Sequence, residues 1–246
     1  MASKDQGNSN YFIYLVSTKN VSPNTLASVN TSQFSLSELK AKFDESLNRG
    51  MHGISFSPYM DNQSPGDPIS EDQIQSRMEI LKPHFRWIRT FSCTEGNEMI
   101  PEIAKRSKIN GSLINHSEHR ISEKEIKNLI KRLKRLKLKT ILCVKNVNES
   151  KKYAKLNPTF IAIEPPELIG TGRAISTEKP HLITKAVDSV KLAKNSTKLL
   201  CGAGIVSGKD VTRAKKLGSK GILVASGIVK AKNWEKIIEE FSRALV

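Results

Sequence analysis

The chain has 246 residues, of which 38% are hydrophobic and 26% are charged, a composition typical of one folded unit rather than a disordered chain. The polar amino terminus does not look like a secretory signal, and no apolar stretch approaches the roughly 18 residues of a membrane-spanning helix. Cys93, Cys143 and Cys201 are too widely spaced to suggest a disulfide framework or a metal site. We therefore expect a reduced, cytoplasmic protein that does not associate with a membrane.

The formal net charge of +16 is unevenly distributed and would by itself suggest a nucleic-acid partner. Residues 1–109 hold 12 basic and 12 acidic side chains, whereas residues 110–246 hold 28 basic and 12 acidic ones. Eight of the cations lie between Lys124 and Lys139, in a segment whose apolar residues recur at helical spacing. This pattern favours the solvated face of an amphipathic helix, and we expect no nucleic-acid partner.

Short apolar runs rich in branched residues alternate with segments of helical periodicity, which predicts parallel strands joined by helices. The expected strands are Tyr11–Ser17, Gly53–Ser57, Trp87–Phe91, Gly111–Asn115, Thr140–Lys145, Phe160–Glu164, Lys198–Gly202 and Gly221–Ala225. Helix-capping signals and periodicity predict helices over Leu39–Asn48, from Ser70 to Pro83, from Ser122 onwards, and over Val147–Leu156, His181–Lys194, Lys209–Leu217 and Trp234–Leu245. Eight strand–helix pairs in about 250 residues predict a single α/β domain, a (β/α)₈ barrel over residues 1–246. Residues 1–33 form its tail, first strand and a polar stretch, Lys19–Gln33, which is a long loop or a linker and the weakest part of the pattern; without a strand over Tyr11–Ser17 the barrel would lack one strand.

In such a barrel, functional groups follow the carboxyl ends of the strands. His116 follows the fourth expected strand, Glu164 ends the sixth, and glycine-bearing turns follow the sixth, seventh and eighth. A phosphate-binding turn beside a histidine and a glutamate suits proton transfer next to a carbonyl group. Each member also has an ordinary structural alternative: a surface ion pair for Glu164, a structural or exposed imidazole for His116, and simple chain reversal for the glycines.

Four motifs beyond about residue 110 resemble those of triosephosphate isomerases of the compact archaeal type, in family order and spacing. They are Asn-His-Ser-Glu (115–118), Glu-Pro-Pro-Glu-Leu-Ile-Gly-Thr-Gly (164–172), Cys-Gly-Ala-Gly-Ile (201–205) and Ala-Ser-Gly (225–227). The resemblance implies that His116 is the electrophile, that Glu164 is the base, and that Pro165–Gly172 is a mobile lid. It also implies a triose phosphate substrate held by backbone groups of Ile169, Gly170, Gly204, Ala225 and Ser226, with no cofactor.

Residues 34–109 resemble instead the opening of family 17 glycoside hydrolases, which are β-1,3-glucanase barrels. The motifs are Gly-Met-His-Gly-Ile-Ser-Phe-Ser-Pro-Tyr (50–59), Gln-Ser-Pro-Gly-Asp (63–67), Ile-Arg-Thr-Phe-Ser (88–92) and Glu-Gly-Asn-Glu (95–98). The catalytic glutamates of that family lie on strands four and seven, where this chain carries the isomerase motifs. Glu95 and Glu98 are the remaining candidate carboxylates, and we expect them to cap the next helix.

The chain therefore reads as a hybrid barrel, with a glucanase-like part over 34–109 and an isomerase-like part over 110–246 that meet near Lys108–Gly111. The isomerase family carries an Asn-x-Lys motif after its first strand, and only Lys19, at a different spacing, could replace that lysine. Three interpretations follow: a triosephosphate isomerase of impaired activity, an inactive chimeric barrel that retains a phosphate site, or a glucan-active hydrolase. The isomerase resemblance also implies a homo-oligomer, whose assembly we expect to be weakened because the first half is replaced.

Overall fold

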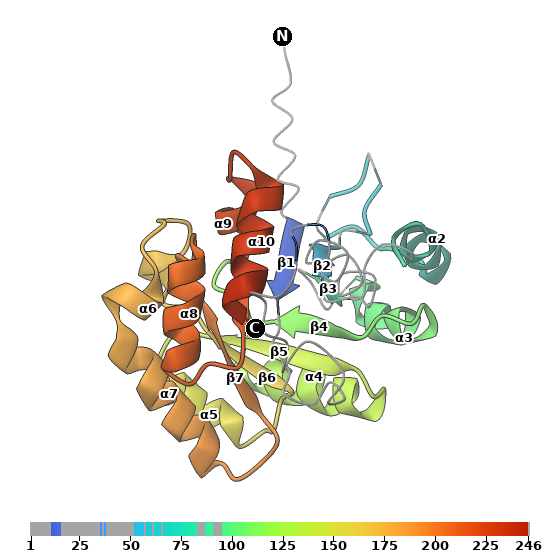
Figure 1. Cartoon of the computed structure of the whole chain (residues 1–246). Helices are drawn as coiled ribbons and strands as arrows, with labels where there is room; N and C mark the ends of the chain where they lie inside the picture. Colours follow the sequence, from blue (N-terminus) through green and yellow to red (C-terminus); the bar gives the residue numbers. More distant parts are fainter. Residues whose placement is uncertain are drawn as a thin grey trace.

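The computed structural model of the chain describes residues 11–15, 35, 37, 52–56, 58–60, 62–64, 66–82, 87–90 and 95–245. Eight strands form a closed barrel in chain order (Figure 1), so the expected α/β barrel is correct. They are β1 (Tyr11–Leu15), β2 (His52–Ser55), β3 (Trp87–Arg89), β4 (Gly111–Ile114), β5 (Lys139–Val144), β6 (Phe160–Ile163), β7 (Lys198–Gly202) and β8 (Ile222–Val224).

The first strand differs from the all-parallel arrangement that we expected. Strands β2 to β8 pair in parallel, but β1 runs antiparallel to both β2 and β8. Leu15, the last residue of β1, pairs with Ile222, the first residue of β8. A continuous apolar run such as Tyr11–Leu15 does not specify in which direction the strand runs. Its backbone can pair with the open edges of β2 and β8 in either the parallel or the antiparallel direction. The carboxyl end of β1 therefore lies at the end of the barrel opposite to the carboxyl ends of the other strands.

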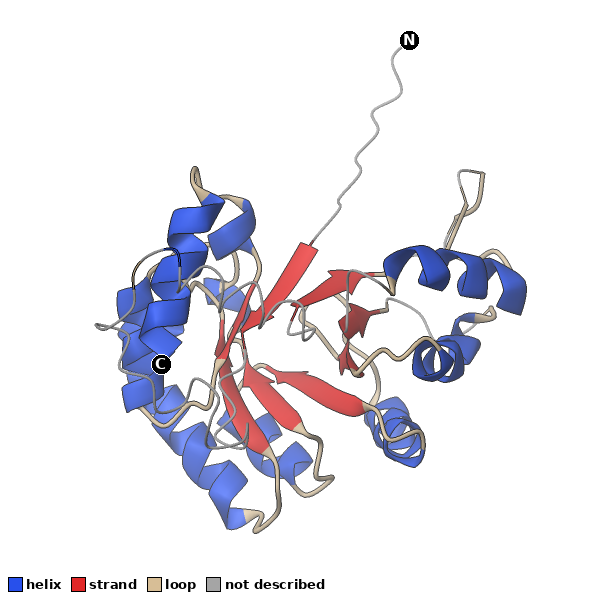
Figure 2. Cartoon of the chain, turned by 45° about the vertical axis from the view of Figure 1, so that its right-hand side comes forward, coloured by secondary structure: helices blue, strands red, loops and turns tan. Residues whose placement is uncertain are grey.

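Helices lie on the outside of the strands (Figure 2). They are α2 (Glu71–Leu81), α3 (Ile100–Arg106), α4 (Glu123–Arg135), α5 (Val147–Ala154), α6 (Ile175–Glu178), α7 (Pro180–Leu192), α8 (Gly208–Lys216), α9 (Ser226–Val229) and α10 (Trp234–Leu245). The predicted caps are confirmed: Ser70 accepts from the Gln73 backbone N–H, and Ser122 and Glu125 form a complete capping box. The short helices α6 and α9 were not predicted, and the helix expected over 39–48 lies outside the described residues.

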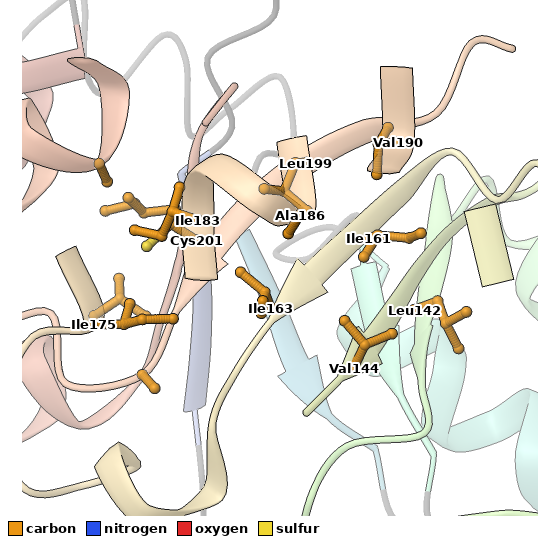
Figure 3. Packing of buried hydrophobic residues seen from close by; sticks show 14 of the residues in the cluster. Leu142, Val144, Ile161, Ile163, Ile175, Ile183, Ala186, Val190, Leu199 and Cys201 are labelled. Carbon is orange, nitrogen blue, oxygen red and sulfur yellow. The ribbon is translucent and has the colours of Figure 1, made fainter. Parts of the chain in front are cut away.

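Two layers of apolar side chains form the core of the described barrel. Along β5, Ile141 and Cys143 point into the barrel, whereas Leu142 and Val144 pack outward against helices, as the two-residue period of a strand requires. The outer cluster is shown in Figure 3, where side chains of β5, β6 and β7 meet those of α6 and α7. Arg89 is among the few buried polar or charged side chains, with 1% of its surface exposed.

The basic face of α4 has the expected environment. Ile126, Ile130 and Leu133 are buried, while Lys127 and Lys131 are exposed on the opposite face. The cations of this helix are therefore solvated, as the sequence predicted. None of the helices in the described ranges is long and apolar enough to cross a membrane.

The Ser122 cap provides a test of how the sequence specifies α4. We expect Ser122→Ala to lower the free energy of unfolding by about 1 kcal/mol, because the Glu125 N–H loses its acceptor. Urea unfolding followed by circular dichroism measures the change. The control is Ser76→Ala, at an exposed position inside α2, which should change stability by less than about 0.5 kcal/mol. Equal effects of the two substitutions would contradict this account of the cap.

Candidate active site

The backbone carrying His116 is fixed by the preceding asparagine. Asn115 has a positive φ of 61°, a conformation that asparagine tolerates better than most residues. Its side-chain amide donates to the Cys143 carbonyl (2.9 Å), and its side-chain oxygen accepts from the Ile121 N–H (3.2 Å). These contacts tie the turn after β4 to the neighbouring strand β5. They direct the His116 side chain into the protein, where only 5% of the residue is exposed.

Glu164 continues β6 beyond its last residue and lies beside the imidazole. Its backbone N–H donates to the Val144 carbonyl (2.8 Å), and its Oε2 atom lies 3.8 Å from His116 Nε2. The residue is 7% exposed, and this Oε2 accepts no hydrogen bond from the described residues. Gly202 on β7 leaves room for the side chain, since a Cβ there would lie 2.4 Å from Glu164 Cγ. A buried carboxylate with an available acceptor atom is suited to removing a proton from a bound molecule.

The hydrogen bonding of His116 indicates which ring nitrogen carries the proton. The Glu118 backbone N–H points to Nδ1 at 3.4 Å, so Nδ1 acts as an acceptor and the proton of the neutral ring resides on Nε2. Burial is the main cause that lowers the pKa of His116 below its ordinary value of 6.5, although the charge of Glu164 acts in the opposite direction. The imidazole is therefore neutral at pH 7 and presents an N–H donor toward Glu164.

Two buried cysteines near Glu164, Cys143 inside the barrel and Cys201 in the outer cluster, are unsuited to nucleophilic chemistry. Burial raises the pKa of the Cys143 thiol well above its ordinary range, and the charge and hydrogen bonding of Glu164 raise it further. Burial likewise raises the pKa of the Cys201 thiol. Both groups stay protonated at neutral pH and behave as small apolar side chains.

The loop after β6 is held at both ends and exposed in its middle. Leu168 is buried, and its carbonyl accepts from the Thr171 hydroxyl at 2.8 Å. Gly170 and Gly172 are exposed and both have a φ of +74°. Lys179 pairs with Glu167 on the outer side of the loop. The segment expected to be a lid therefore has its own internal contacts, with glycines where the chain turns most sharply.

The loops after β6, β7 and β8 pack on one another through glycines. A Cβ at Gly204 would lie 2.0 Å from the Arg173 carbonyl, and a Cβ at Gly227 would lie 2.1 Å from the Ile205 carbonyl. Gly204 also has a positive φ of 71°. The expected phosphate contacts lie on these consecutive loops: Ile169 and Gly170 after β6, Gly204 after β7, and Ala225 and Ser226 after β8.

Other residues occupy positions that the sequence reasoning did not assign. Arg89 lies at the end of β3 and pairs with Glu118 (2.9 Å); the alternation from the inward-facing Trp87 could have indicated its orientation.

Glu95 and Glu98 are both exposed, and the Glu98 carboxylate accepts from the Gly96 N–H (2.9 Å) at the start of a helical turn. Lys19 lies outside the described residues. The described ranges contain no group of three or more His, Cys, Asp or Glu that could hold a metal ion.

Residues 92–241 match the family model described as triosephosphate isomerase. The chain belongs to the triosephosphate isomerase family. The match includes all four isomerase-like motifs and also residues 92–109, which the sequence interpretation assigned to the front part of the barrel. It does not include β1, β2 or β3.

Curated relatives of this family are similar to the chain over part of its length. The triosephosphate isomerase of Cenarchaeum symbiosum is 48% identical over 147 residues, which cover 60% of this chain and 66% of the relative. That of Methanocaldococcus jannaschii is 47% identical over 142 residues, 58% of this chain and 65% of the relative. The chain thus matches slightly less than two thirds of the length of these relatives.

The barrel is also similar to solved structures outside this family. A flavocytochrome b2 variant with sulfite bound aligns with a TM-score of 0.53 at 13% identity, covering 82% of this chain and 57% of that one. At this identity the likeness shows the fold alone.

The lowered pKa of His116 predicts a pH dependence of folding in this family member. The unfolded chain binds a proton near pH 6.5 but the folded chain only at lower pH, so stability is lost as pH falls below about 6.5. We expect the free energy of unfolding to fall less steeply between about pH 7 and pH 5 in His116→Asn than in the parent. Urea titrations at several pH values measure both slopes. Identical slopes would contradict burial of a neutral imidazole.

The space that Gly202 leaves for Glu164 predicts an energetic coupling between the two positions. We expect Gly202→Ala to cost about 1–3 kcal/mol, because the added methyl group overlaps the glutamate side chain. In a Glu164→Ala background the same substitution should cost much less. Thermal unfolding of the four proteins of this double-mutant cycle gives the coupling energy. Additive effects would show that Gly202 is not what accommodates the carboxylate.

Proposed function

We propose that this chain is a triosephosphate isomerase that interconverts dihydroxyacetone phosphate and glyceraldehyde 3-phosphate. The observation that carries the proposal is the pairing of a buried, neutral His116 with a buried Glu164, 3.8 Å apart from Nε2 to Oε2. A neutral histidine and a carboxylate base are the known catalytic pair of the family to which the chain belongs.

In the proposed reaction Glu164 acts as the base. Its carboxylate takes a proton from the carbon next to the substrate carbonyl, and the electron pair of that C–H bond moves toward the carbonyl oxygen to form an enediolate. The Nε2–H of His116 donates to the oxygen on which negative charge develops, and this hydrogen bond strengthens as the charge grows. The imidazole then passes its Nε2 proton to that oxygen and takes up the hydroxyl proton of the neighbouring oxygen, so that the O–H group moves from one carbon to the next. Glu164 finally returns its proton to the adjacent carbon, and both side chains are regenerated. The step transfers protons only and consumes no cofactor.

The substrate phosphate is proposed to bind the backbone N–H groups of the loops after β6, β7 and β8, at Ile169, Gly170, Gly204, Ala225 and Ser226. Two features of the geometry support this assignment. Gly204 adopts a left-handed conformation in which its turn lies against Arg173 in the loop after β6, and α9 begins at Ser226. Backbone N–H groups at such turns are good anion donors. Closure of Pro165–Gly172 over the substrate is proposed to exclude water from the enediolate.

We also propose that residues 34–109 derive from a barrel like those of family 17 glycoside hydrolases. Their motifs and the neutral charge balance of residues 1–109 support a separate origin. The isomerase match begins at residue 92 and therefore overlaps the end of this part, before the proposed join near Lys108–Gly111. A hydrolase activity has little support, since Glu95 and Glu98 are exposed and Glu98 serves as a cap.

A coupled assay of triose phosphate interconversion tests the proposed reaction. We expect Glu164→Gln to reduce kcat by about 10³-fold, because the amide cannot accept the proton. Glu98→Gln, which alters an exposed carboxylate, is the control and should retain the parental rate.

Two results would contradict the proposed activity. One is a parent whose rate equals the uncatalysed background, which would favour an inactive barrel that retains a phosphate site. The other is a Glu164→Gln variant as active as the parent. Laminarin hydrolysis that is lost in Glu98→Gln would instead support the glucanase interpretation.

A further inference from the structure

We propose that Arg89 is a positioning residue of this site: from a strand outside the family match, it supplies the buried positive charge that holds Glu118 against His116. The arrangement is an ion pair of 2.9 Å between Arg89 Nη1 and Glu118 Oε2, with the same carboxylate oxygen 3.4 Å from His116 Nδ1. The consequence for catalysis rests on the proposed isomerase function, whereas the contacts themselves do not.

Arg89 is fixed in place by strand geometry. It is the last residue of β3, and its carbonyl accepts from the Phe56 N–H at 2.8 Å. Trp87 faces the barrel interior and Ile88 packs outward against residues of α2 and α3, so alternation turns Arg89 inward again. Arg89 and His116 line the same cavity of about 60 Å³ beside β4. The guanidinium is therefore confined next to the candidate catalytic histidine.

The energetic balance of this ion pair suggests a role other than stability. Burying a guanidinium costs several kcal/mol, and an ion pair commonly only compensates for that cost. A well-packed apolar residue would serve the fold equally well in this largely apolar interior. The Glu118 side chain is 52% exposed, so it could turn into solvent if Arg89 did not hold it. What Arg89 adds is the orientation of Glu118 and a positive charge beside the imidazole.

Four charged groups face His116, from three parts of the structure. Glu164 after β6 and Glu118 after β4 favour the protonated ring, whereas Arg89 on β3 and Arg120 after β4 disfavour it. With both arginines present, two positive charges oppose two negative ones. Arg89 acts on the ring more strongly than Glu118, so removing Arg89 makes the imidazole easier to protonate even when Glu118 turns into solvent as well. Arg89 thus helps to keep His116 in the neutral form that donates from Nε2.

The antiparallel first strand makes this cation more important. Leu15 pairs with Ile222 at the amino end of the barrel, so the carboxyl end of β1 lies opposite the site. Among the described residues, Arg89 is the only lysine or arginine that is buried. A cation from β3 therefore occupies this end of the barrel, in a part of the chain that the family match does not cover.

The test compares the parent with Arg89→Met and Arg89→Lys, using NMR of protein labelled with ¹⁵N-histidine. The chain has five histidines, and His116→Asn assigns the resonance of interest. We expect Arg89→Met to raise the pKa of His116 by about 1 unit, because a neighbouring positive charge is lost. Arg89→Lys should stay close to the parental value. The acidic limb of the kcat profile should move to higher pH in Arg89→Met by the same amount.

An unchanged His116 titration in a folded Arg89→Met variant would overturn the proposal, as would a loss of thermal stability without any shift. If Arg89→Met does not fold, Glu118→Gln tests the same pair from the other side. It removes a negative charge and should lower the pKa of His116, whereas an unchanged value would again overturn the proposal. The titration requires no turnover, so it tests the role of Arg89 even if the parent is inactive. An active parent whose His116 titration does not shift in Arg89→Met would refute the role of Arg89 but not the isomerase function.

Discussion

The candidate site depends on strand β5, because both of its principal side chains are tied to that strand through the backbone. The Cys143 carbonyl accepts from Asn115, which orients the turn before His116, and the Val144 carbonyl accepts from the Glu164 N–H. Parallel pairing on both sides of β5 fixes the relative heights of β4 and β6 to within one residue. The separation of 3.8 Å between imidazole and carboxylate is thus a consequence of sheet register rather than of flexible loops.

Local patterns in the sequence were sufficient to predict most of the barrel. Strand β7 and helix α10 have the predicted bounds, and the caps at Ser70 and Ser122 form as expected. These signals are local, since a capping serine or a period of 3.6 residues acts within one helical turn. The rule that strand ends converge places His116 and Glu164 at one end of the barrel, but their distance depends on register, which no local pattern specifies.

What the sequence did not reveal depends on contacts between distant segments. The direction of β1 is set by pairing with β2 and β8, whose residues lie far away in the chain. The inward orientation of Arg89 required knowing the face on which Trp87 lies. Arginine is rarely buried, so composition alone gives no reason to expect this side chain inside the barrel. Burial of this charge could be recognised only once Glu118 was seen beside it.

The buried ion pair between Arg89 and Glu118 has a consequence for modularity. Arg89 precedes the family match, which begins at residue 92, whereas Glu118 lies within it, so the two segments share a charge balance as well as an apolar core. A half-barrel exchanged for another of equal size and hydrophobicity would leave one of these charges without its counterpart. Recombination between barrels of this kind is therefore constrained by electrostatic matching at the strand ends, in addition to strand tilt and side-chain volume. A half-barrel can replace the first part of this one when it carries a cation at the end of its third strand.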